Sequence, residues 1–161
     1  MSKLICLAQP EKKLEQLGLE IPKYSAPIAN YAKWVKDGNK LYLAGHGHCG
    51  NPTRVDRGKV GRDLTVEDGY LAARNVGLCM LATIKDAIGD LSKVKRIIRV
   101  MGMVNSTENF VDHPKVMNGF SDLMVEVFGD KGRHVRSAVG MSSLPLNLAV
   151  EIEMLLEIDD D

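Results

Sequence analysis

The strongest structural signal in this 161-residue chain is a segment of helical periodicity from Thr65 to Gly89. Thr65 followed three residues later by Asp68 is typical of a capping box, and Gly89 ends the repeat. Between them, residues recur at helical spacing at Tyr70, Ala73, Gly77, Leu81, Ile84 and Ile88. The pattern predicts a helix of about 23 residues, roughly 35 Å long at 1.5 Å per residue.

Shorter segments on either side predict five strands and two further helices. Strands are expected over residues 31–35, 41–44, 97–104, 135–141 and 148–158, a second long helix over 112–129, and one or two helical turns over 10–17. The first two strands are joined by a turn at 37–39 and form a hairpin. Residues 45–61, rich in Gly, Pro, Asn and Asp, predict a long loop, and such loops are often functional.

This order of elements predicts an α+β fold with a mixed sheet, in one domain over residues 1–161. Residues 1–24 form an N-terminal extension that carries the short helix. Two long helices can cover only one face of the sheet. Along 150–155, however, alternate positions place apolar side chains on both faces. We therefore expect another copy of the chain to cover the second face.

Charge and cysteine content bound the classes of partner and compartment. Lys plus Arg and Asp plus Glu number 21 each, so the chain has no global positive field that would attract nucleic acid or an anionic membrane. Cys6, Cys49 and Cys79 are odd in number and contain no Cys-x-x-Cys, which predicts free thiols in a reducing compartment. No apolar segment has the length of a signal peptide or a membrane span, so we expect a cytoplasmic protein.

The segment that most directly indicates a ligand lies near the end of the chain. Arg136 is placed in a strand of Ser, Ala, Val and Gly, and the next strand carries Glu151 and Glu153. Side chains this small leave space beside a guanidinium, whose planar fork binds a carboxylate through two parallel hydrogen bonds. A small acidic metabolite is the predicted ligand. The alternative is a structural ion pair between Arg136 and Glu151 or Glu153 of another subunit.

These residues resemble the signature of the RidA/YjgF family of reactive-intermediate deaminases, also called L-PSP endoribonucleases. The segments 136–139, 144–145 and 151–153 match the family's Arg-Ser-x-Val, Leu-Pro and Glu-Ile-Glu without a gap. Segments 29–31, 44–46, 60–88 and 116–120 are also similar, so the resemblance covers roughly residues 25–158.

The resemblance implies a homotrimer with a chorismate-mutase-like fold, clefts between subunits, and no metal or other cofactor. Active members hydrolyse 2-imino acids to 2-keto acids and ammonia. By position, Arg136 would bind the substrate carboxylate and Glu151 would place or activate the attacking water. Tyr31, Asn118 and His46 would line the cleft. This chemistry is coherent because an imine is already electrophilic, so orientation and a polarised water supply most of what hydrolysis needs.

The sequence also departs from the family pattern. Asn30, His46, Ala138 and Gly140 stand where the family has Pro, Gln, Cys and Glu, and the loop over 47–58 is longer. We therefore expect a divergent branch with a rebuilt pocket wall. The alternative to an enzyme is a non-catalytic trimer of the same fold that binds a small carboxylate as a sensor or buffer. The zero net charge counts against a ribonuclease.

A metal site is the competing interpretation of the cluster His46, His48 and Cys49. Two histidines two residues apart at the end of a strand face the same side, and a thiol adds a soft ligand. A zinc site needs three or four ligands, and the remaining histidines, His113 and His134, lie beside helix ends without paired spacing. We therefore expect this loop to shape the mouth of the cleft and predict no metal.

Overall fold

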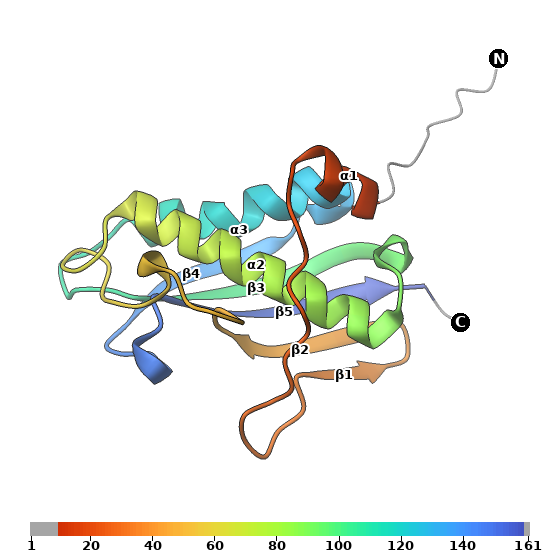
Figure 1. Cartoon of the computed structure of the whole chain (residues 1–161), viewed down its shortest axis with the longest axis horizontal. Helices are drawn as coiled ribbons and strands as arrows, with labels where there is room; N and C mark the ends of the chain where they lie inside the picture. The colour runs from red at the N-terminus through yellow and green to blue at the C-terminus, as the bar shows by residue number, and fades with distance from the viewer. Residues whose placement is uncertain (1–9, 160–161) are drawn as a thin grey trace.

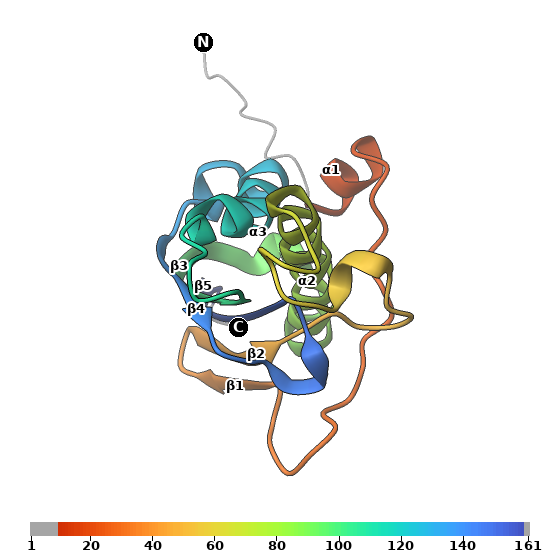
Figure 2. The ribbon, with the colours of Figure 1, turned by 90° about the vertical axis from the view of Figure 1, so that its left-hand side faces the viewer.

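The computed structural model describes residues 10–159, which form a layer of helices packed on a five-stranded sheet (Figure 1). In chain order the helices and strands are α1 (Pro10–Gln16), β1 (Trp34–Asp37), β2 (Lys40–His46), α2 (Val66–Ile88), β3 (Val94–Asn105), α3 (His113–Phe128), β4 (Val135–Met141) and β5 (Val150–Ile158). Short 3₁₀ turns join them, among them η1 (Arg54–Asp56) and η4 (Pro145–Asn147). Figure 2 shows α2 and α3 on the same side of the sheet. The α+β fold with two long helices over one face is confirmed.

Helix α2 begins and ends where the sequence predicts. The Asp68 backbone N–H donates to Thr65 Oγ1 (3.1 Å), and the Thr65 N–H donates to Asp68 Oδ2 (3.0 Å). Both orphan donors of the first turn are thus satisfied, as in a capping box. Arg54 also donates to the Asp68 carboxylate and, as the largest cause, lowers the pKa of Asp68 to about 2. Gly89 follows the helix with a φ of +79°.

Helix α3 packs so closely on α2 that one of its positions requires glycine. A Cβ atom at Gly119 would overlap the backbone carbonyl of Tyr70 on α2. Asp112, which directly precedes α3, makes no capping hydrogen bond with its side chain. Its Oδ1 instead lies 3.0 Å from Lys115 Nζ.

The sheet is mixed, as predicted, with the strand order β1-β2-β5-β3-β4. Only the pairing of β3 with β4 is parallel, and the other three pairings are antiparallel. Strand β1 begins at Trp34 rather than at Tyr31, because the preceding residues turn and the Tyr31 N–H donates to the Ala29 carbonyl (2.9 Å). Strand β5 begins at Val150 because residues 145–147 form η4.

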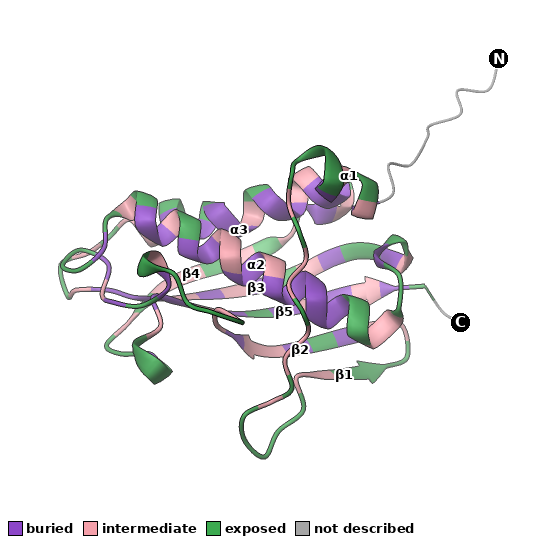
Figure 3. Ribbon diagram, in the orientation of Figure 1, coloured by how far each residue is buried: buried purple, intermediate pink, exposed green. Residues whose placement is uncertain are grey.

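Side chains of β5 alternate between a buried face and an open face. Val150, Ile152 and Met154 are buried against the helices, whereas Glu151 and Glu153 point to the opposite side. Along residues 10–159 no helix covers that open side, and parts of the strands are exposed (Figure 3). Val135 is 66 % exposed and Tyr42 is 47 % exposed. The structure therefore leaves uncovered the face that the sequence assigned to a second copy.

The prediction of free thiols is wrong for two of the three cysteines. Cys49, in the loop after β2, forms a disulfide with Cys79 on α2. The sequence did not indicate this pair because the two residues are 30 positions apart and meet only when the loop folds back onto α2. Cys6 lies outside the described residues. Neither α2 nor α3, nor any other helix within 10–159, is long and apolar enough to cross a membrane.

Candidate functional site

Arg136 lies on the edge strand β4 and is held by α3. Its Nη1 donates to Asn118 Oδ1 (3.1 Å) and to Ser121 Oγ (2.9 Å), and its Nη2 donates to the Pro114 carbonyl (3.3 Å). All three acceptors are neutral oxygens, and no carboxylate within residues 10–159 forms an ion pair with this side chain. Of the five N–H donors of a guanidinium, two remain, one on Nε and one on Nη2. They form an edge that suits the two oxygens of a carboxylate.

A histidine that the sequence analysis did not select fixes Ser121 in this arrangement. His134 Nδ1 lies 2.7 Å from the Gly132 carbonyl, so this nitrogen carries the proton. His134 Nε2 then accepts from Ser121 Oγ (3.0 Å), and the Ser121 oxygen is left to accept from Arg136. Burial lowers the pKa of His134, which favours this neutral form. Because Ser121 is three residues after Asn118 on α3, helical spacing could have indicated it.

Burial also lowers the pKa of Arg136, and the negative charge of Asp122 opposes that effect. The guanidinium is thus partly removed from water without a bonded counter-ion among the described residues. A desolvated cation of this kind gains free energy from an anionic ligand.

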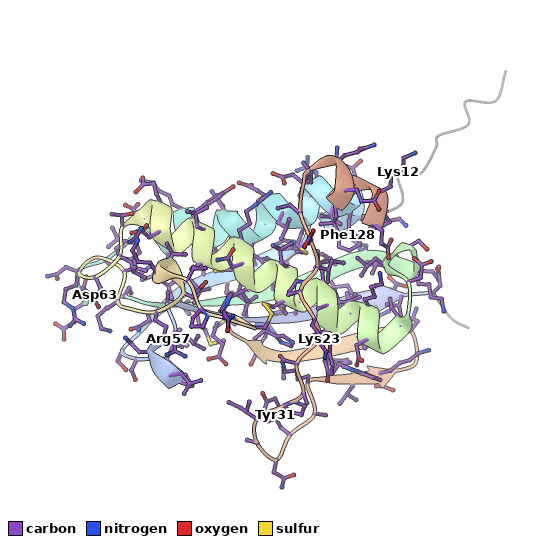
Figure 4. All side chains as sticks on the ribbon, viewed as in Figure 1. Lys12, Lys23, Tyr31, Arg57, Asp63 and Phe128 are labelled. Atoms are coloured by element: carbon purple, nitrogen blue, oxygen red, sulfur yellow. A yellow bond between two sulfur atoms is a disulfide. The ribbon has the colours of Figure 1, made fainter. Side chains whose placement is uncertain are left out.

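Three other predicted site residues lie around a cavity of about 460 Å³ at the end of β2, away from Arg136. Tyr31, His46 and Glu151 line it, together with the loop after β2 and the segment around η4. The Glu151 carboxylate rests on the backbone of Gly45, where a Cβ atom would overlap it. Burial is the main cause of a raised Glu151 pKa, and the charge of Glu153 adds to it. Tyr31 lies in the loop before β1 and is 42 % exposed; Figure 4 labels this side chain.

His46 forms a wall of this cavity with both ring nitrogens engaged inside the protein. Its Nδ1 lies 2.6 Å from the Ala44 carbonyl, and its Nε2 lies 2.9 Å from Thr83 Oγ1 on α2. The side chain is only 3 % exposed, and burial lowers its pKa, so the ring is neutral. His46 can shape the cavity but has no free nitrogen with which to bind a ligand.

The cluster of His46, His48 and Cys49 does not provide a set of metal ligands. The Cys49 sulfur is bonded to Cys79, and both nitrogens of His46 are engaged. His48 Nε2 lies 2.9 Å from the Asn51 carbonyl. Across residues 10–159, no group of three or more His, Cys, Asp or Glu side chains could hold a metal ion.

A buried carboxylate, Asp56, organises this loop and was missed by the sequence analysis. It accepts from Thr53 N (2.6 Å), Thr53 Oγ1 (2.7 Å) and Asn75 Nδ2 on α2 (3.1 Å). His48 Nδ1 lies 3.4 Å from Asp56 Oδ1. Together with the disulfide of Cys49, these contacts fix the loop against α2, so the cavity wall has a defined shape.

Arg136 and Glu151 lie on opposite faces of the sheet, whereas His46 is on the helix side with Thr83 of α2. Arg136 of β4 pairs with Val100 of β3, which pairs with Met154 of β5. Met154 is buried against the helices, so Arg136 is on the helix side of the sheet. Glu151 is at an odd position of β5 and faces the open side. Strand β3 also separates β4 from β5, which places their backbones roughly 10 Å apart at about 4.8 Å per strand spacing. One small ligand cannot contact both Arg136 and Glu151 of the same chain.

A larger hollow of about 770 Å³ lies near the end of β4, but its cation is already satisfied. Lys59 Nζ donates to Asn105 Oδ1 (2.8 Å) and to the carbonyls of Ser106 (3.2 Å) and Ser142 (2.7 Å). This lysine braces the ends of β3 and β4 and offers little to an anion. The hollow is therefore a weaker candidate than the cavity at Glu151.

Comparison with known proteins agrees with the signature around Arg136. Residues 11–158 match the family model described as "YjgF/chorismate_mutase-like, putative endoribonuclease". The chain belongs to the YjgF family. The expectation from the sequence is thus confirmed at the level of the family and its fold.

Among YjgF relatives, the chain is 38 % identical to Protein TCP17 of Trypanosoma cruzi over 148 residues, which cover 91 % of this chain and 92 % of that protein. Two solved structures are also similar. Atu1372 of Agrobacterium tumefaciens, a protein of unknown function, has a TM-score of 0.85 and 41 % identity, with 93 % of this chain and 94 % of that chain covered. A "putative endoribonuclease" of Shewanella oneidensis has a TM-score of 0.88 and 35 % identity, with 93 % and 99 % covered.

A more distant YjgF structure shows the shared fold alone. RidA of the Antarctic bacterium Psychrobacter has a TM-score of 0.56 and 21 % identity, with 84 % of this chain and 94 % of that chain covered.

Proposed function

We propose that this protein is a cofactor-free deaminase that hydrolyses small 2-imino or enamino acids to 2-keto acids and ammonia. The observation that carries the proposal is the state of Arg136. Its guanidinium is partly buried, bound by three neutral oxygens, and retains two N–H donors for a carboxylate. A fixed guanidinium without a bonded carboxylate suits a ligand that brings its own negative charge.

The proposed reaction uses Glu151 as the proton carrier. Water adds to C2 of the iminium ion and gives one proton to the Glu151 carboxylate, so that a neutral carbinolamine forms. Glu151 returns this proton to the nitrogen and then accepts the hydroxyl proton while the C–N bond breaks. The products are the 2-keto acid and ammonia, which takes the last proton from Glu151 and leaves as ammonium. A carboxylate is a better base as its pKa approaches the working pH, so the raised pKa of Glu151 favours this role.

We propose that each site is completed by two copies of the chain in a homotrimer. One copy would supply Arg136 and Asn118, and its neighbour would supply Glu151 and Tyr31. Two observations support this assembly: Arg136 and Glu151 lie on opposite faces of one sheet, and the open face carries exposed apolar side chains. Sedimentation should therefore give about three times the 17.7 kDa mass of the chain.

An assay for imine release tests the proposal. An amino-acid oxidase generates the 2-imino acid in the presence of semicarbazide, which traps the imine unless the protein converts it first. The wild-type protein should lower the yield of trapped imine, and Arg136→Ala should lose that effect. Arg133→Ala is the matched control, because Arg133 is exposed and pairs with Asp130. Failure of the wild-type protein to divert any imine contradicts the deaminase.

A non-catalytic carboxylate-binding protein of the same fold is the alternative, and it makes a different prediction. Calorimetry would then show binding of 2-oxobutyrate that Arg136→Ala removes, with no turnover of any imine. The name endoribonuclease, carried by the family model and the Shewanella relative, is tested by cleavage of RNA. The equal numbers of acidic and basic residues argue against it for this chain.

A further inference from the structure

Two cationic side chains line the cavity that contains Glu151, and the deaminase chemistry uses neither of them. Lys33 precedes β1, and Arg57 follows η1 in the long loop. Both belong to the same cavity wall as Tyr31 and Glu151. Figure 4 labels Arg57 and Tyr31, which come from two segments far apart in the sequence.

Lys33 is held in place without a bonded carboxylate. Its Nζ donates to Ser25 Oγ (2.8 Å) and lies 5.7 Å from the centre of the Tyr24 ring. No Asp or Glu within residues 10–159 forms an ion pair with it. Burial lowers the pKa of Lys33, as expected for an ammonium group that has lost part of its water without gaining a counter-ion.

The backbone around Arg57 pairs with the segment after η4, and this pairing positions Arg57 at the cavity. Arg57 and Leu148 form an antiparallel bridge, the Gly58 N–H donates to the Asn147 carbonyl (2.9 Å), and the Ala149 N–H donates to the Asp56 carbonyl (3.0 Å). The guanidinium itself has no hydrogen bond or ion pair with residues 10–159.

Neighbouring cations in the same stretch of chain have protein partners. Arg54 pairs with Asp68, and Arg62 pairs with Asp63. Among the arginines of residues 54–62, Arg57 is thus the one without a partner in the described part of the chain, and its side chain is exposed.

The charges around the proposed shared site do not balance with a simple monocarboxylic acid. Lys33 and Arg57 of one copy and Arg136 of its neighbour give three positive charges. Glu151 supplies one negative charge, and the α-carboxylate of the ligand supplies a second. His46 is neutral, and any charge on His48 is matched by Asp56 3.4 Å away. One positive charge of the protein remains without a partner, and the iminium ion of the substrate adds another.

We propose that the preferred ligand carries a second anionic group, so that the substrate is a small 2-imino diacid. This inference rests on the proposed function, because Arg136 binds the α-carboxylate in both. Lys33 and Arg57 bind the second anionic group of the ligand. The ammonium group of Lys33 acts as a point charge, and the guanidinium of Arg57 donates from a planar fork. The cavity of about 460 Å³ is within the usual range of small-molecule sites, about 300–1,000 Å³.

Calorimetry with stable 2-oxo acids on the intact protein tests the inference. The probes are 2-oxobutyrate, with one carboxylate, 2-oxoglutarate, with two, and 3-phosphonopyruvate, whose second group is a phosphonate. At least one of the two dianionic probes should bind about 10-fold tighter than 2-oxobutyrate, the effect of one added charge-assisted contact. The tighter of the two identifies the second group as carboxylate or phosphorus acid.

Variants connect that preference to the two cations. Arg57→Ala and Lys33→Gln should each lower the ratio of diacid to monoacid affinity toward one. Arg62→Ala, which removes a nearby exposed arginine outside the cavity, should retain the wild-type ratio. A ratio that survives both cavity substitutions overturns the assignment of these residues.

The outcomes also separate this inference from the deaminase itself. If 2-oxobutyrate binds through Arg136 and the dianionic probes bind no tighter, the second anionic group is refuted and the proposed function stands. If no 2-oxo acid binds, the proposed function fails and this inference fails with it.

Discussion

The disulfide between Cys49 and Cys79 gives a stability prediction whose size follows from the structure. The bond closes a segment with a sequence separation of 30 residues and fixes the loop after β2 to α2. Closing such a loop removes about 12 cal/mol/K of entropy from the unfolded chain, or about 3.6 kcal/mol at 25 °C. For a domain of this size, that change corresponds to a fall in Tm of roughly 10 °C.

The perturbation is Cys49→Ser, chosen because Cys49 is partly exposed whereas Cys79 is buried. Differential scanning calorimetry at one protein concentration should give the wild-type protein the higher Tm by roughly 10 °C under oxidising conditions. With dithiothreitol present, the two proteins should converge, because both then lack the cross-link. Equal Tm values for Cys49→Ser and fully oxidised wild type, or a difference that dithiothreitol does not remove, would refute the reasoning.

Three further predictions concern single side chains. Arg136→Lys keeps the charge but loses the planar fork, so calorimetry should show about a 10-fold or greater loss of affinity for a 2-oxo acid, and unchanged affinity would contradict it. Burial and Glu153 raise the pKa of Glu151 above its ordinary 4.5, so the folded state keeps a proton that the unfolded chain has released. The free energy of unfolding should therefore fall as the pH rises from 4.5 through the raised pKa of folded Glu151. Glu151→Gln should raise Tm more at pH 8 than at pH 4, and an equal rise in Tm at the two pH values would contradict this prediction. Gly119→Ala places a Cβ against the Tyr70 carbonyl and should cost about 1–3 kcal/mol in urea unfolding, whereas a neutral effect would mean that α2 and α3 can separate.

The sequence was sufficient for elements whose signals are local. The start of α2 follows from Thr65 and Asp68, which are three residues apart, and its end follows from Gly89, so each boundary is decided within one turn of the helix. The alternation along β5 also gave the correct assignment of Glu151 to the open face. The start of β1 was less predictable, because a backbone turn at Tyr31 decides it.

Features that depend on distant contacts were not available from the sequence. The Cys49–Cys79 disulfide and the buried Asp56 both result from the long loop folding onto α2. The partners of Arg136 show the same difference between what the sequence indicates and what depends on packing. Asn118 was expected from the resemblance, but Ser121 and its support from His134 required the packing of α3 beside β4.

The separation of the site residues onto two faces is a consequence of strand register. The family resemblance implied that Arg136 and Glu151 belong to one site in a cleft between subunits. Their positions in the sheet show that they do not meet within one chain. This separation within one chain is the structural reason for proposing a site shared between copies.

Subunit complementation tests the central claim of a shared site most directly. The variants Arg136→Ala and Glu151→Gln should each be inactive alone. The two proteins are then mixed in equal amounts under conditions that exchange subunits. If each site takes Arg136 from one copy and Glu151 from its neighbour, about a quarter of the sites in a randomly mixed ring contain both intact residues, and that fraction of activity should return. Exchange of subunits, verified by mass, with no recovery of imine hydrolysis would contradict the account.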